Sequence, residues 1–436
     1  MNSQPDPRNV KNTFIANKLA SVDPNFANLT DMTPLNPPVE GGKFSPPPLE
    51  GELEGVNLDL LILIFAPGTP SPKIWERGPG VRAFHGLIEY AQYIQPEGTR
   101  MPNPKQIGIG MIGAGFLAET RARCYAQVSG YQPRIVAVGT RTEASAAGYA
   151  ARHGVSKSFA NYGQLLALPE VDVVDLCVPN HMHRPIAEAA AAAGKHIICT
   201  KPLTAYVGQD MPADATDEAI SGVDRDRMLE VATADAQAMV DAADESGVHL
   251  MYGENWIYAP AITRAEGLIK ASQGAIVELR GGECHNGSHS PYSKIWRYTG
   301  GGALLHLGTH PIGAMLYLKQ QEGLARDGRP IRPVAVSAET GDLSRIPSVA
   351  AQEQPWIVTG WQDVENWAAL IITFDDGSRA VVHASDAVLG GMESKLEIYL
   401  SNSRLICNLS PNNLLAAYAP HPDVFGNEYI MEKPSL

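Results

Sequence analysis

The 436-residue sequence lacks any long apolar run: Leu60 to Phe65 is its most apolar stretch, far short of the ~20 residues that span a bilayer. Its N-terminus lacks a basic start followed by an apolar stretch, so we expect no targeting signal. Lys and Arg (34) are fewer than Asp and Glu (47), and the net charge of −13 argues against nucleic acid and membrane as partners. The five cysteines form no CxxC pair, which favours reduced thiols and a cytoplasmic location. The expected partner is therefore a small molecule.

Residues 1–104 are Pro-rich, with Pro37-Pro38 and Pro46 to Pro48 in their first half. This composition predicts an N-terminal extension, either disordered or laid as an extended arm on its own or a neighbouring subunit. Residues 58–65 and 81–93 carry enough apolar side chains for us to expect the second half of the extension to be ordered.

A glycine-rich stretch, Gln106 to Ala118, joins a short apolar run to a helical pattern. Gly113, Gly115 and Ala118 occupy the small positions of G-x-G-x-x-G/A, which permit a tight turn and let backbone approach a pyrophosphate at a helix N-terminus. The motif alone is weak and also fits a flexible turn. Its place between strand and helix favours a dinucleotide site.

From Lys105 onward, apolar strands alternate with helical patterns, which predicts an α/β Rossmann domain over 105–253: a parallel sheet with helices on both faces. Alternating strands after Glu254 predict an α+β domain over 254–436 with a largely antiparallel open sheet. The acidic insertion 206–227 is expected to be a solvated surface loop, with a lid over the site as the alternative.

Three motifs in this order, GxGxxA, Asp172 to His183, and Gly194 to Leu203, resemble the Gfo/Idh/MocA family of NAD(P)-dependent sugar and cyclitol oxidoreductases. The resemblance covers about residues 105 to 410. It implies NAD or NADP, which some relatives hold tightly, and a homo-oligomer, dimer or tetramer, formed through the C-terminal sheet. The residues then expected to bind the cofactor are Gly113, Gly115, Phe116, Leu117, Thr140, Arg141, Pro179, Asn180, His183 and Lys201.

The loop after the second strand, where an acidic residue would bind the ribose 2′-hydroxyl, reads Gly139-Thr140-Arg141. It has no carboxylate. Arg141 could accept a 2′-phosphate or stack on adenine, which favours NADP and leaves NAD open.

Lys201 follows a buried strand and precedes Pro202, so its backbone is restrained. It matches the lysine of the family's Glu-Lys-Pro motif, which the resemblance makes catalytic, but Thr200 replaces the Glu. A surface lysine is the alternative.

His306 and His310 are four residues apart, which on a helix places them on one face. We expect no metal, because there is no H-E-x-x-H pattern and no clear third ligand. The family has Asp and His at these two positions, where they bind substrate hydroxyls and relay a proton. With His306 in place of the Asp, we expect His310 to be harder to protonate. Two structural histidines are the alternative.

A polar loop, Glu283 to Arg297, resembles the family's substrate loop. An aromatic side chain could stack on a sugar, and cations could reach an acidic substituent. The alternative is an ordinary polar surface loop, and, for Tyr258, packing at a domain junction. The candidate substrate residues are Tyr258, His285, His289, Lys294, Trp296 and Arg297.

These observations predict hydride transfer from a secondary alcohol of a sugar, glycoside or cyclitol, with Lys201 and His310 handling the hydroxyl proton and His306 assisting. The alternative is an NAD-dependent oxidoreductive glycosidase, which oxidises a ring carbon transiently, eliminates the aglycone and restores the alcohol. An acidic sugar is a candidate substrate for this alternative. A third hypothesis is a cofactor-sensing binding protein, because the family's Glu and Asp are missing.

Overall fold

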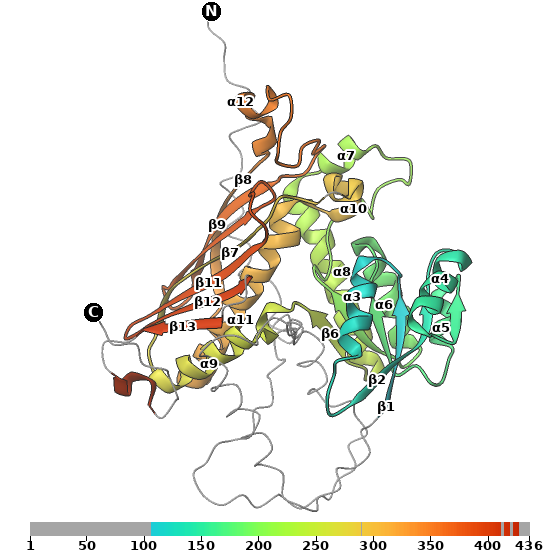
Figure 1. The fold of residues 1–436 in the computed structure, drawn as a ribbon, viewed down its shortest axis with the longest axis horizontal. Helices are drawn as coiled ribbons and strands as arrows, with labels where there is room; N and C mark the ends of the chain where they lie inside the picture. Colours follow the sequence, from blue (N-terminus) through green and yellow to red (C-terminus); the bar gives the residue numbers. More distant parts are fainter. Residues whose placement is uncertain (1–105, 289, 411–413, 419–421, 427–436) are drawn as a thin grey trace, which may run out of the picture.

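The computed structural model describes residues 106–288, 290–410, 414–418 and 422–426, which form two sheets with their helices (Figure 1). The two N-terminal stretches expected to be ordered, 58–65 and 81–93, lie outside the described residues. Among the described residues, no helix is long and apolar enough to cross a membrane. All five cysteines are free thiols, and Cys199, Cys284 and Cys407 are buried.

Sheet A contains six parallel strands in the order β3-β2-β1-β4-β5-β6. This is the doubly wound arrangement that the alternating sequence pattern predicted. The strands are β1 (Gln106–Ile112), β2 (Gln132–Gly139), β3 (Lys157–Phe159), β4 (Val173–Leu176), β5 (His196–Thr200) and β6 (Leu250–Gly253).

Helices cover both faces of sheet A, as expected. Alternate side chains of β1 divide between two apolar clusters: Ile109 packs with α3 (Phe116–Tyr125) and α4 (Glu143–His153), whereas Ile112 packs with the other set of helices. That set comprises α5 (Tyr162–Leu166), α6 (His183–Ala192) and α8 (Arg225–Ser246).

The acidic insertion is more ordered than expected. It contains α7 (Asp217–Ser221), and its Tyr206 and Ile220 form a buried cluster with Met228 and Val231 of α8. The expectation of a solvated surface loop is therefore only partly met: most of its carboxylates are exposed, but apolar residues interspersed among them bury against α8.

Sheet B has seven strands in the order β13-β12-β11-β7-β10-β9-β8, and only the β7–β10 pair is parallel. The predicted largely antiparallel sheet is confirmed. Its strands are β7 (Ile276–Cys284), β8 (Pro333–Gly341), β9 (Trp367–Phe374), β10 (Arg379–Ser385), β11 (Glu393–Leu400), β12 (Arg404–Ser410) and β13 (Leu414–Tyr418).

One face of sheet B packs on α9 (Pro260–Ser272) and α11 (Thr309–Asp327), burying side chains such as Leu268, Met315 and Leu370. The connections hold short helices: η5 (Asn180–Met182), η6 (Trp256–Tyr258), η7 (Pro291–Lys294), α10 (Trp296–Thr299), η8 (Leu304–Gly308), η9 (Leu343–Arg345), α12 (Pro347–Ala350) and η10 (Pro422–Phe425).

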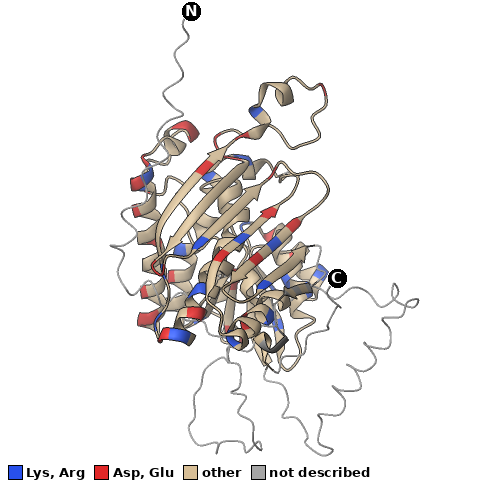
Figure 2. Ribbon diagram, turned by 90° about the vertical axis from the view of Figure 1, so that its left-hand side faces the viewer, with Lys and Arg blue, Asp and Glu red and all other residues tan. Residues whose placement is uncertain are grey.

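Among the described residues, no helix packs on the opposite face of sheet B. Figure 2 views this face directly and shows uncharged stretches of strand between charged positions. The apolar side chains Val277, Ile371 and Val381 are 50%, 48% and 37% exposed, and Ile371 pairs with Val381 across β9 and β10.

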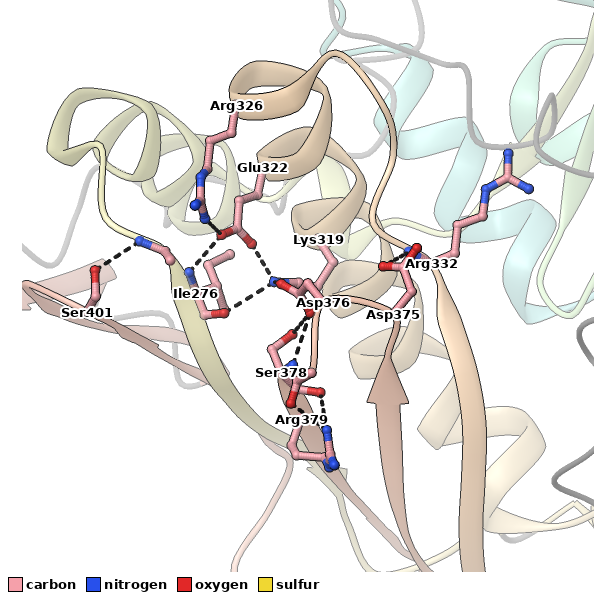
Figure 3. A network of polar contacts seen from close by, with 12 residues as sticks. Ile276, Lys319, Glu322, Arg326, Arg332, Asp375, Asp376, Ser378, Arg379 and Ser401 are labelled. Carbon is pink, nitrogen blue, oxygen red and sulfur yellow. Dashed lines mark hydrogen bonds and ion pairs between the residues drawn. The ribbon is translucent and has the colours of Figure 1, made fainter.

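A buried ion-pair network fastens α11 to sheet B (Figure 3). Lys319 is fully buried, and its Nζ donates to Glu322 Oε2 (2.5 Å), Asp376 Oδ2 (2.8 Å) and the carbonyl of Ile276 (3.2 Å). Glu322 also accepts hydrogen bonds from Ile276 N and Arg326 Nη1, both at 2.9 Å. The network joins α11 to the start of β7 and to the turn between β9 and β10.

Candidate active site

The glycine stretch forms an open cradle at the end of β1. Gly113 has φ +107°, and a Cβ there would lie 2.2 Å from the carbonyl oxygen of Cys177, so only glycine fits. A Cβ at Gly115 would meet nothing within 4 Å, and no described side chain caps the N-terminus of α3. Free helix N–H groups beside open space fit a pyrophosphate.

The other expected cofactor residues lie around this cradle. Phe116 is 85% exposed and Leu117 is half-buried. Thr140 donates to the carbonyl of Thr142 (2.7 Å), and Arg141 is exposed, with no hydrogen bond or ion pair to another described residue. The guanidinium of Arg141 is therefore available to a ligand.

The loop after β4 is held by a hydrogen bond to the end of α10. Pro179 is exposed, and Asn180 Nδ2 donates to the carbonyl of Thr299 (2.8 Å), at the end of α10. His183 is fully buried, and its ring nitrogens lie 3.0 and 3.1 Å from the carbonyls of Leu203 and Val178. The structure thus places His183 behind the loops, where it links them, leaves Pro179 exposed and holds the half-buried Asn180 against α10.

Lys201 stands directly after β5, and its Nζ donates to the backbone carbonyl of His306. Burial lowers the pKa of Lys201, and the nearby carboxylates of Glu283, Glu254 and Asp386 oppose that shift. A lysine with a lowered pKa can take up and release a proton more readily near neutral pH. These three carboxylates lie near Lys201 in a chain that has Thr200 where the family has Glu. They stand on or directly after β6, β7 and β10.

His310, in the first turn of α11, is oriented by a carboxylate. Its Nδ1 lies 2.5 Å from Glu254 Oε1, and Glu254 directly follows β6, the strand next to β5. The same carboxylate accepts hydrogen bonds from the backbone N–H groups of Trp256 and Ile257. Gly313 makes room for it: a Cβ at Gly313 would lie 2.8 Å from Glu254 Cγ.

Glu254 and His310 hold one proton between them at neutral pH. Burial raises the pKa of Glu254 to about 8, against its backbone hydrogen bonds and the charge of Lys201. Burial also lowers the pKa of His310 to about 3, and the charge of Lys201 adds to this effect. A neutral carboxyl beside a neutral imidazole is therefore favoured, with the proton between Oε1 and Nδ1. The pKa of His310 is thus lowered chiefly by burial and Lys201, whereas His306, the cause expected from the sequence, contributes least.

A further carboxylate, Glu283, accepts a hydrogen bond from Trp256 Nε1 (3.1 Å), and burial raises its pKa. The Trp256 ring stacks on His310 at a centroid distance of 6.2 Å and an interplanar angle of 10°. Glu254 and Glu283 were missed by sequence reasoning. The position of Glu254 immediately after a parallel strand was the signal that could have found it.

His306 lies in η8, a π-helical turn, and does not share a partner with His310. Its Nε2 lies 2.8 Å from Asp386 Oδ2, at the end of β10, and His285 Nδ1 lies 3.4 Å from Asp386 Oδ1. Each of the two histidines, expected on one helix face, thus lies beside a carboxylate of its own, and the charge of His306 still acts on His310.

The predicted substrate residues divide into two groups. Tyr258 (6% exposed) and His285 lie near the carboxylates of the site. Burial and the charge of Glu254 raise the pKa of Tyr258, and burial lowers that of His285. Trp296, Lys294 and Arg297 bind the protein itself.

In this second group, Trp296 Nε1 donates to the carbonyl of Tyr206 (2.9 Å), Lys294 Nζ to that of Thr359 (2.5 Å), and Arg297 Nε to Asp217 Oδ1 (2.5 Å). Arg297 thereby fastens the acidic insertion. His289 lies outside the described residues. In the described part of the chain, no three His, Cys, Asp or Glu side chains are arranged to hold a metal ion.

Two family models match this chain. "Oxidoreductase family, NAD-binding Rossmann fold" matches residues 107–217, and "GFO/IDH/MocA C-terminal domain" matches residues 268–406.

Levoglucosan dehydrogenase from Pseudarthrobacter phenanthrenivorans is 28% identical over 297 residues, 64% of this chain and 68% of that protein. A D-xylose 1-dehydrogenase (NADP(+)) from Haloferax volcanii is 30% identical over 143 residues, 33% of this chain and 36% of that protein. Among solved structures, an NAD binding oxidoreductase from Klebsiella pneumoniae superposes with a TM-score of 0.56 at 26% identity, covering 74% of this chain and 77% of its own.

Fold and glycine cradle together define an NAD(P)-binding oxidoreductase. With both of its sheets matched by models of one family, the chain belongs to the Gfo/Idh/MocA family.

Proposed function

We propose that this protein is a dehydrogenase that removes hydride from a secondary alcohol carbon of a sugar or a related polyol. The observation that supports it most is the meeting of Lys201 with the Glu254–His310 pair at the carboxyl ends of β5 and β6. Ligands of open α/β sheets bind at this edge. The chain's relatives include dehydrogenases of levoglucosan and of D-xylose.

When bound, the nicotinamide accepts the hydride. The protein has to hold the alcohol and take its proton. Lys201, with its pKa lowered by burial, donates a hydrogen bond to the hydroxyl and shares in removing its proton. His310 Nε2 accepts that proton when the Glu254–His310 pair has lost its own. His306 assists beside them. No described contact favours the glycosidase.

The test is a screen of the purified full chain with NAD⁺ or NADP⁺ and a panel containing levoglucosan and D-xylose, followed by absorbance of the reduced nicotinamide. The proposal expects one sugar to give net reduction, and Lys201→Met to lower its turnover by about 10²-fold or more without loss of cofactor binding. Unchanged turnover in Lys201→Met would overturn the assignment of Lys201. Sugar products released without net reduction would overturn the dehydrogenase.

We also propose that residues 105–253 and 254–436 act as the cofactor and substrate domains and that the chain forms a homo-oligomer through the open face of sheet B. The exposed apolar pair Ile371 and Val381 on β9 and β10, with Val277 exposed on β7, supports this, because exposed apolar side chains of a sheet can pack against a partner. Native mass spectrometry of the wild type and of Val381→Glu tests it. The proposal expects a dimer or tetramer for the wild type and smaller species for the variant.

A further inference from the structure

Asp386 is a buried carboxylate whose oxygens accept no hydrogen bond from a described residue. It directly follows β10, is fully buried, and is fixed through its backbone N–H, which donates to the carbonyl of Asn366 (2.8 Å). Its side chain lies 2.8 Å from His306 Nε2 and 3.4 Å from His285 Nδ1. Lys201 and Glu365 are the other charged groups near these rings.

Four neighbouring polar atoms in this cluster are buried without a hydrogen-bond partner among the described residues: both carboxylate oxygens of Asp386 and both ring nitrogens of His306. The two side chains are at ion-pair distance, but their angles do not make a hydrogen bond. Buried unsatisfied polar atoms are rare and costly, so a cluster of them points to function. In ligand-free active sites, catalytic hydrogen bonds are often misaligned and tighten when the substrate binds.

The sequence around His306 sharpens this point. The resemblance expects an Asp where this chain has His306, four residues before His310. The structure places the carboxylate of Asp386 beside His306 from another strand, because β10 packs against η8. The site therefore contains an imidazole with a carboxylate next to it.

We propose that Asp386 is the positioning residue of His306: it accepts the Nε2–H, fixes that tautomer, and leaves Nδ1 as the acceptor for a substrate hydroxyl or its proton. The arrangement is a carboxylate–imidazole pair parallel to Glu254–His310, and its catalytic consequence rests on the proposed function. A carboxylate partner fixes both the tautomer and the orientation of a histidine ring.

The first arm of the test needs no substrate. Nitrogen chemical shifts of the histidine rings are measured by NMR on the full chain labelled with ¹⁵N-histidine, with His306 assigned by comparison with His306→Gln. The wild type is expected to carry its proton on Nε2, and Asp386→Asn to lose that single tautomer. Glu266→Gln, another buried carboxylate, is the matched control and should leave His306 unchanged. A wild-type His306 protonated on Nδ1, or of mixed tautomer, overturns the proposal without any variant having to fold.

The second arm uses NAD⁺ or NADP⁺ with levoglucosan and with D-xylose. Asp386→Asn is expected to lower kcat by about 10- to 100-fold in the wild type and to cause no further loss in the His306→Gln background, because Asp386 acts through that ring. A merely structural role predicts the same loss in both backgrounds, and that result would overturn the proposal. If the wild type oxidises no sugar, the proposed function fails, while the NMR arm still decides the role of Asp386.

Discussion

Replacing Glu254 with Gln tests the proton held between Glu254 and His310. Oε2 of Glu254 accepts from the backbone N–H groups of Trp256 and Ile257, so the glutamine is expected to keep its carbonyl oxygen there. Its NH₂ group then faces His310 Nδ1, which must act as the acceptor. Nε2 of His310 is left permanently protonated and cannot serve as a base.

The size of the effect follows from the pKa of about 8 at Glu254. With that pKa, about a tenth of the pairs lack the shared proton at pH 7 and about nine tenths lack it at pH 9. The wild-type rate of sugar oxidation should therefore rise about tenfold between pH 7 and pH 9 and then level off. In Glu254→Gln we expect kcat to fall by about 10²-fold and this rise to disappear.

The assay is the steady-state rate of nicotinamide reduction across a pH series, with the sugar identified by the screen, together with the dissociation constant of the cofactor. Lys201, Glu283 and His306 lie around the same pair, so a Lys201→Met profile separates the contribution of the lysine. Glu266→Gln is the control and should keep the wild-type profile. If Glu254→Gln retains the rise centred near pH 8, the shared-proton reasoning is refuted.

Three further predictions concern residues around or behind the site. Arg141→Ala should weaken NADP⁺ binding by about tenfold and leave NAD⁺ nearly unchanged, because one charge-assisted contact to a 2′-phosphate is lost; equal effects on both cofactors in fluorescence titrations would contradict this. Gly313→Ala should reproduce much of the kcat loss of Glu254→Gln because its Cβ displaces Glu254, whereas Gly267→Ala, with nothing within 4 Å of the added Cβ, should be neutral. Lys319→Met should lower the free energy of unfolding by about 3–5 kcal/mol, since it strands buried carboxylates. Lys157→Met, at an ion pair whose two side chains are both exposed, should cost below about 1 kcal/mol. Similar urea midpoints for the two lysine variants would show that the network in Figure 3 does not stabilise the fold.

The fold could be predicted from the sequence to a large extent, because the periodicity of apolar residues and the turn residues at the ends of helices and strands indicate it. The Ala-rich pattern from Glu143 to His153 gives α4 with the expected ends, and the strand-plus-glycine pattern gives β1 and its cradle. The acidic insertion was misjudged because a count of carboxylates hides the few apolar residues, Tyr206 and Ile220, that bury against α8.

Residues of the site could be predicted from the sequence only where they belong to a motif that the resemblance covers. Lys201 and His310 stand in such motifs. Glu283 lies on β7 and Asp386 directly after β10, and the sequence does not reveal the register of these strands. The partners of Lys294 and Arg297 depend on tertiary packing. Polar side chains that looked suited to a sugar are used to hold the protein together.

The hydrogen bond from Asn180 to the carbonyl of Thr299 has a consequence for the order of binding. Asn180 stands on a loop expected to bind the cofactor, and Thr299 ends α10, which follows the predicted substrate loop. A cofactor bound on that loop would restrain α10 through this hydrogen bond. We therefore expect the dinucleotide to bind before the sugar and to leave after it.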